Sequence, residues 1–233
     1  MQNQTPALAD PLAIWLQFAL CVTLIGLAGA RLIRYGDAIA SWTGMSRSWI
    51  GLILVASVTS LPELVTGLSS VTIARAPDLA VGDVLGSCVF NLAILAAIDI
   101  GYRKAPLYGV VSQQHLLSAG FGVIMLASAA LLLLLDQQGQ LPALGHVSLG
   151  SPLLLALYLL ALRAIYLSEK RQPAAAESEP ALMSLRAALT GYALAAMVVV
   201  ASGVWLPLIG VELARMMNWS NSLVGTLLMA LAT

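Results

Sequence analysis

Residues 58–64 read V-T-S-L-P-E-L and lie inside an apolar stretch at about 49–71. Pro62 has no amide hydrogen and its ring clashes with the carbonyl four residues earlier, so a helix through this stretch is expected to kink or break and to free the carbonyl of Val58. Glu63 follows directly, and a carboxylate in mid-membrane costs roughly 2.5 to 3.5 kcal/mol on insertion scales. Two costly features at one position suggest a shared use.

The composition around this stretch indicates an integral membrane protein. Of the 233 residues, 60% are hydrophobic and 9% are charged, and a soluble domain would lack the polar surface to cover that much apolar area. A spanning helix needs roughly 20 mostly apolar residues. Six such windows are predicted, at 12–33, 49–71, 79–98, 115–135, 149–167 and 187–209.

A seventh apolar run begins near Trp219 and reaches Thr233. It has about 15 residues, fewer than the roughly 17 to 25 that a crossing requires, so we expect the chain to stop partway through a span. The segment before the first window has no basic residue and does not resemble a signal peptide, so we expect the first span to be retained. The fold class expected is an all-α multi-pass membrane protein.

The distribution of basic residues predicts the orientation in the membrane. Nine of the eleven Lys and Arg residues fall in or beside the loops after the first, third and fifth spans. Because loops rich in Lys and Arg stay in the cytoplasm, the N-terminus is expected outside.

The polar residues of the second window form a set of oxygen donors. Thr59 and Ser60 precede Glu63 by four and three residues, so a helical path places their oxygens on neighbouring positions of one face. Freed carbonyls, hydroxyls and a carboxylate suit hard cations such as Na⁺ and Ca²⁺, whereas Zn²⁺ and Cu favour His and Cys. The alternative is a proline kink beside a glutamate that snorkels to the interface or is protonated.

The third window carries a polar stripe, in which Asp83, Ser87 and Asn91 recur at intervals of four residues. Gly82 and Gly86 form a G-x-x-x-G pattern that allows close approach of another helix. The alternatives are interhelical hydrogen bonding without a ligand and glycines that serve packing alone. Asp83 is expected a turn or two below the interface, where a solvated carboxylate is ordinary.

Other classes of function find no support in the sequence. No P-loop, nucleophile elbow, zinc motif or basic nucleic-acid patch occurs, so neither an enzyme nor a nucleic-acid-binding protein is expected. Cys21 and Cys88 both lie inside predicted spans and are interpreted as small apolar residues rather than a disulfide.

The second half of the chain shows signs of an inverted repeat. Residues 168–180 have linker composition and follow five spans, so a second copy would enter the membrane upside down. Aligning 50–59 with 224–233 pairs Gly51 with Gly225, Leu54 with Leu228, Ala56 with Ala230 and Thr59 with Thr233.

V-T-S-L-P-E-L, followed by A-P-D-L-A-V-G-D-V-L-G-S-C-V-F-N at 76–91, resembles the first alpha repeat of the sodium/calcium exchanger family, within the cation/calcium antiporter superfamily. The resemblance implies two inverted five-helix repeats with ten spans, of which this chain would hold about six and a half. Residues 1–167 would be the first five-helix exchanger repeat, 168–183 a cytoplasmic linker, and 184–233 a second repeat cut off in its second helix.

The resemblance also implies a set of cation ligands. Two positions depart from the family pattern, because Asp83 stands where G-N is common and Cys88 where G-S-N is common. The Ser and Glu of the second repeat, and its third span, are missing. The implied metal ligands are Thr59, Ser60 and Glu63 from the second span, Ser87 and Asn91 from the third, and Thr233 from the second repeat.

The function expected is exchange of Na⁺ for Ca²⁺ across a cell (inner) membrane, by alternating access at a midplane oxygen site. Ca²⁺ and Na⁺ would be transported ions rather than permanently bound cofactors. Membrane lipid and either the missing second half or a second copy of the chain would be the partners. The alternatives are a proton- or potassium-coupled cation/calcium antiporter and a non-transporting membrane fragment.

Overall fold

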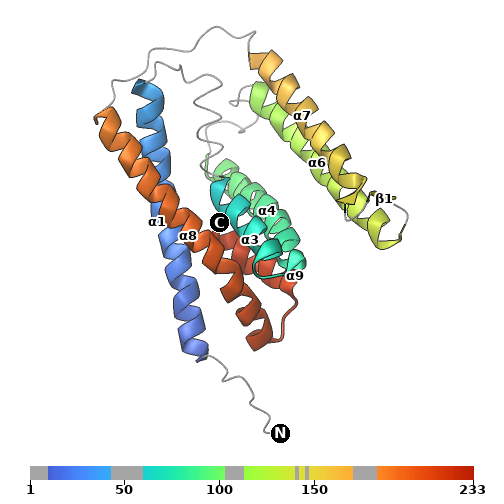
Figure 1. The fold of residues 1–233 in the computed structure, drawn as a ribbon. Coiled ribbons are helices and arrows are strands. Elements are labelled where there is room, and N and C mark those ends of the chain that lie inside the picture. The colour runs from blue at the N-terminus through green and yellow to red at the C-terminus, as the bar shows by residue number, and fades with distance from the viewer. Residues whose placement is uncertain (1–9, 43–59, 103–112, 140–141, 145–146, 170–182) are drawn as a thin grey trace. The chain divides into compact units, whose positions relative to one another are not determined.

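The computed structural model describes residues 10–42, 60–102, 113–139, 142–144, 147–169 and 183–233. They form two compact units, one made of Met1–Ile98 with Ala175–Thr233 and the other of Asp99–Ala174. The first unit contains helices α1 (Pro11–Trp42), α3 (Leu61–Thr72) and α8 (Leu185–Met217), and α4 (Pro77–Gly101) up to Ile98. They are followed by the short helices α9 (Asn221–Val224), η1 (Gly225–Met229) and α10 (Ala230–Ala232) (Figure 1).

The second unit is a pair of helices, α6 (Gln113–Gln137) and α7 (Gly150–Glu169). Between them lie two-residue strands, β1 (Ala143–Leu144) and β2 (Val147–Ser148), paired antiparallel. The helices pack closely where Gly150 meets the side chain of Leu132.

The helices confirm an all-α multi-pass membrane protein. In the described part of the chain, five helices are long and apolar enough to cross a membrane: Pro11–Trp42, Pro77–Gly101, Leu117–Gln137, Gly150–Ser168 and Leu185–Met217. The second predicted window is described only from Ser60 onward, where it forms α3. The predicted break before Pro62, with Val58 and Thr59, lies outside the described residues.

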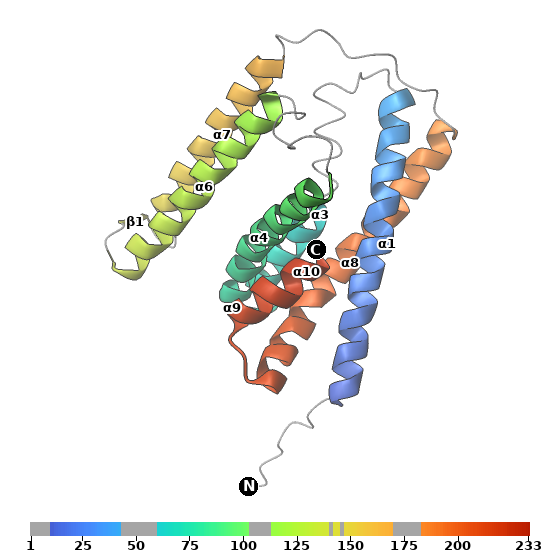
Figure 2. The ribbon, with the colours of Figure 1, turned by 180° about the vertical axis from the view of Figure 1, so that it is seen from behind.

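Helices α1 and α8 pack side by side and run antiparallel (Figures 1 and 2). They contain 32 and 33 residues, and at about 1.5 Å per residue each exceeds the roughly 30 Å of a bilayer core. Their seam is apolar, with Ala28, Leu32, Ala195 and Val199 buried. An antiparallel first pair of this kind is what an inverted repeat requires.

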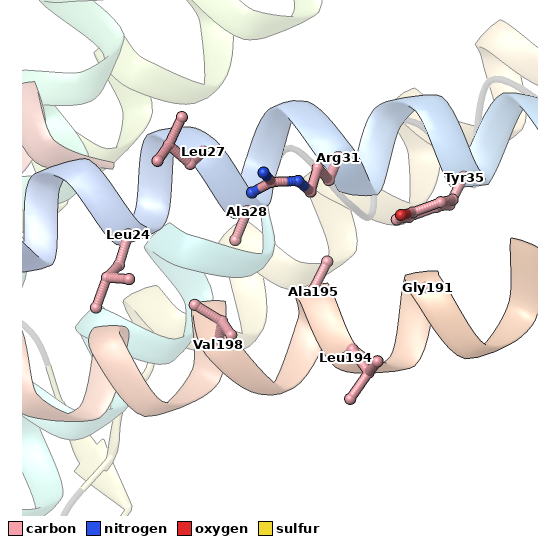
Figure 3. Close-up of a pocket in the computed structure, with 9 residues that line it drawn as sticks. All are labelled: Leu24, Leu27, Ala28, Arg31, Tyr35, Gly191, Leu194, Ala195 and Val198. Carbon is pink, nitrogen blue, oxygen red and sulfur yellow. The ribbon is translucent and has the colours of Figure 1, made fainter.

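A groove of about 320 Å³ follows the α1–α8 seam. Figure 3 shows Arg31 and Tyr35 on α1, the lining residues with polar side-chain groups, among lining residues that are otherwise apolar. The groove is lined by Leu24, Leu27, Ala28, Arg31, Tyr35, Gly191, Leu194, Ala195 and Val198.

A tight reversal connects α3 to α4. The carbonyl of Ser69 accepts the amides of Ile73 and Ala74, the carbonyl of Ser70 accepts the amide of Ala76, and each bond is 2.8–2.9 Å long. Arg75 takes a left-handed conformation with φ of 52°, which non-glycine residues rarely adopt. This turn sends the chain back along α3, so that side chains of α3 and α4 meet.

Candidate cation site

Helix α3 begins where the sequence places its proline and carboxylate. Pro62 is the second residue of the helix, where the missing amide hydrogen costs no helical hydrogen bond. Glu63 therefore lies in the first turn, at the end of the helix that favours negative charge. It is half-buried, and its Oε2 atom is buried with no hydrogen-bond partner among the described residues.

Asp83 of α4 is completely buried. Thr66 of α3 donates its hydroxyl hydrogen to Asp83 Oδ2 at 2.7 Å. The carbonyls of Pro62 and Glu63 lie farther from the same hydroxyl, at 2.9 and 3.1 Å, and a charged acceptor forms the stronger bond. Thr233 Oγ1 approaches the other carboxylate oxygen, Oδ1, at 3.3 Å. Asp83 thus joins α3 to the residue that follows α10.

The oxygens around Thr233 are widely spaced. Its hydroxyl lies 3.4 Å from the Ser87 hydroxyl and 3.3 Å from the Met229 carbonyl, whereas O–H···O hydrogen bonds are usually about 2.5–3.0 Å long. Oxygens at right angles around a Ca²⁺ ion, each about 2.3–2.6 Å from it, are separated by about 3.3–3.7 Å. The spacing around Thr233 is therefore that of cation ligands as well as that of weak hydrogen bonds.

Glycines bring Thr233 to α4. A Cβ atom on Gly82 would lie 2.5 Å from the Ser222 carbonyl oxygen, and one on Gly86 would lie 2.7 Å from the Cβ of Ala230. A Cβ on Gly225 would meet the Leu79 carbonyl. The G-x-x-x-G pattern thus makes the predicted close approach, and its partner is the α9–η1–α10 segment, which lies beside α4 in Figures 1 and 2.

The structure brings two of the predicted ligands into contact with each other and places a third near Asp83, which lies beside them. Ser87 and Thr233 are in contact, and Glu63 lies close enough to Asp83 for their carboxyl groups to interact electrostatically. Ser60 and Asn91 have exposed side chains. Thr59 lies outside the described residues.

Sequence reasoning missed two residues of the cluster. Asp83 lies in the second turn of α4, and it is enclosed by Thr66 and Thr233 rather than solvated. Thr66 follows Glu63 by three residues, and that helical spacing was the signal that could have identified it. The described residues contain no group of three or more His, Cys, Asp or Glu that could hold a metal.

Long apolar helices around buried oxygen donors define a class, the multi-pass membrane transporters. Within it, residues 13–168 match the family described as "Sodium/calcium exchanger protein". These residues make up more than half of the chain, which therefore belongs to the sodium/calcium exchanger family.

Two curated relatives are similar to parts of the chain. Over 144 residues the chain is 38% identical to "Putative antiporter CaxA" of Alkalimonas amylolytica, covering 61% of this chain and 42% of that protein. Over 85 residues it is 31% identical to "Inner membrane protein YrbG" of Escherichia coli K12, covering 36% of this chain and 25% of that protein. The chain thus spans less than half the length of each. No solved structure matches it.

Proposed function

We propose that the protein containing this chain exchanges Na⁺ for Ca²⁺ across an inner membrane, with its N-terminus outside. The observation that carries the proposal is the convergence of α3, α4 and the end of α10 on one buried cluster of oxygens. Glu63 and Asp83 bring carboxyl groups to this cluster, and Ser87 and Thr233 bring hydroxyls.

Charge supports a cation as the ligand. Burying an ionised carboxylate is costly unless a positive charge compensates it. In the part of the chain that the structure describes, the one ion pair is Arg215 with Glu212, on the surface. Two carboxyl groups without a basic partner are matched by a divalent ion or by two monovalent ions, and oxygen donors favour Na⁺ and Ca²⁺ over softer metals.

The arrangement of the ligands fits alternating access. Glu63 and Ser87 come from the first predicted repeat and Thr233 from the second, so a shift of one repeat against the other would open the site to either side of the membrane. We propose Thr59, Ser60 and Asn91 as further ligands on the family motif alone, whereas the packing of described residues supports Glu63, Ser87 and Thr233.

Flux of radiolabelled Ca²⁺ into proteoliposomes under an imposed Na⁺ gradient tests the function. The full-length protein should accumulate Ca²⁺, and Glu63→Gln should reduce uptake at least tenfold because it removes a ligand charge. Glu212→Gln is the matched control, since Glu212 is an exposed acid paired with Arg215, and it should transport like wild type.

The same assay separates the alternatives. If a proton or potassium gradient drives Ca²⁺ uptake and a Na⁺ gradient does not, the coupling ion is H⁺ or K⁺ rather than Na⁺. Absence of flux under all three gradients, or full flux from Glu63→Gln, would contradict the proposal.

A further inference from the structure

We infer that Asp83 determines the valence preference of the cation site, by supplying a second negative charge beside that of Glu63. The inference rests on the proposed function, and it assigns to this chain the charge that a divalent ion needs beyond one carboxylate. Asp83 would then favour Ca²⁺ over Na⁺.

The first argument is placement. Asp83 has 0% of its surface exposed, and its two carboxylate oxygens face different segments, α3 and the residue that follows α10. Oδ2 is held by the Thr66 hydroxyl at 2.7 Å, while Oδ1 faces Thr233 at 3.3 Å. The short bond to Thr66 fixes the carboxylate, and Oδ1 faces the hydroxyl of Thr233, which itself lies 3.4 Å from the Ser87 hydroxyl.

The second argument is distance. A Ca²⁺ ion bound to Thr233 Oγ1 would lie about 2.4 Å from that oxygen. Added to the 3.3 Å between Thr233 Oγ1 and Asp83 Oδ1, this places the ion at most about 5.7 Å from the carboxylate. At an effective dielectric constant of about 20, one elementary charge at that distance alters the affinity for a divalent ion about a hundred-fold more than that for a monovalent ion.

The third argument is compensation. Both hydrogen-bond partners of Asp83 are neutral hydroxyls, and no Lys, Arg or His forms an ion pair with it within the described ranges. A residue that served only to join α3 to α10 would need no charge, because an asparagine makes the same number of contacts. The buried carboxylate is explained when a cation lies beside it.

Competition between Ca²⁺ and Na⁺ in the full-length protein, at fixed pH, tests the inference. In Asp83→Asn the apparent KM for Ca²⁺ should rise about a hundred-fold more than that for Na⁺. Asp78→Asn is the matched control, because Asp78 is an exposed acid in the first turn of the same helix, and it should keep the wild-type ratio. An equal rise in both KM values, or no change in their ratio, would show that Asp83 only positions its neighbours and would overturn the inference.

A second variant keeps the test decisive if Asp83→Asn does not fold. In Glu63→Gln, equilibrium binding of Ca²⁺ should remain tighter than that of Na⁺, because the charge of Asp83 is still present. Loss of this preference would mean that Glu63 is the sole charge and would refute the inference. If the wild-type protein neither binds nor moves Ca²⁺ and Na⁺, the proposed function fails; if it does both and only the variants disagree, the inference alone fails.

Discussion

Adding one methyl group at Gly86 should weaken both the fold and the site. A Cβ atom there would meet the Thr226 carbonyl and lie 2.7 Å from the Cβ of Ala230 and the Cα of Thr226. Ordinary carbon contacts begin at 3.4 Å, so α4 and the α9–α10 segment must separate by about 0.7 Å or more. Most of these atoms belong to the backbone or to a short side chain, which cannot rotate out of the way.

The cost follows from this overlap. Overpacking of a close-packed interface typically costs about 1–3 kcal/mol, and we expect Gly86→Ala to lower the free energy of unfolding by about 2 kcal/mol. Ser87 is the next residue on α4 and already lies 3.4 Å from Thr233. Separation of the helices should widen that gap and raise the KM for Ca²⁺.

Gly67→Ala on α3 provides the control. A Cβ atom at Gly67 meets nothing within 4 Å, and alanine favours a helix over glycine by about 1 kcal/mol, so this variant should equal or exceed wild-type stability. Unfolding in mild detergent, with and without Ca²⁺, measures both variants. Equal stability and equal Ca²⁺ affinity in the two variants would refute the reasoning.

Two further predictions concern α1 and its contact with α8. Gly191→Ala places a methyl against the ring of Tyr35. Because the end of the tyrosine side chain can move away, the free energy of unfolding should fall by less than about 1 kcal/mol. A fall as large as that of Gly86→Ala in the same unfolding assay would contradict this. In a variant whose own cysteines are replaced, Asp10→Cys should react with an impermeant maleimide from outside intact cells and Asp37→Cys only after permeabilisation. This follows from the proposed orientation, in which the basic residues keep the end of α1 in the cytoplasm. The opposite labelling would reverse that orientation.

Composition and periodicity were sufficient for the fold class but not for the extent of its helices. The first and sixth windows, 12–33 and 187–209, became helices of 32 and 33 residues. Hydropathy identifies the part of a helix that is apolar enough to lie in lipid, which for α1 is the window 12–33. Burial along α1 continues beyond that window to Gly36 and Ala38. The extension depends on partners far away in the chain, because Trp42 bonds to Met183, 141 residues later, and Tyr35 contacts Gly191, and no local pattern reveals such contacts.

The site was predictable to the extent that its chemistry is local. Glu63 was recognisable because a carboxylate beside a proline is costly wherever the helix ends. Asp83 was not, because its burial depends on the reversal at Arg75, which sets Thr66 against it, and on Thr233, which is 150 residues away. A sequence shows the cost of a buried charge, but only packing shows what surrounds it.

The glycines and the hydroxyls of this site act together at one close crossing, between α4 and the α9–η1–α10 segment. Serine and threonine side chains are short, so their oxygens can share one ion only where two backbones come unusually close. Gly82 and Gly86 create that approach against Gly225, and Ser87 and Thr233 follow at the point of contact. Larger residues at the crossing would hold the hydroxyls apart even with every ligand retained. Cation affinity should therefore depend on the glycines as strongly as on the ligands.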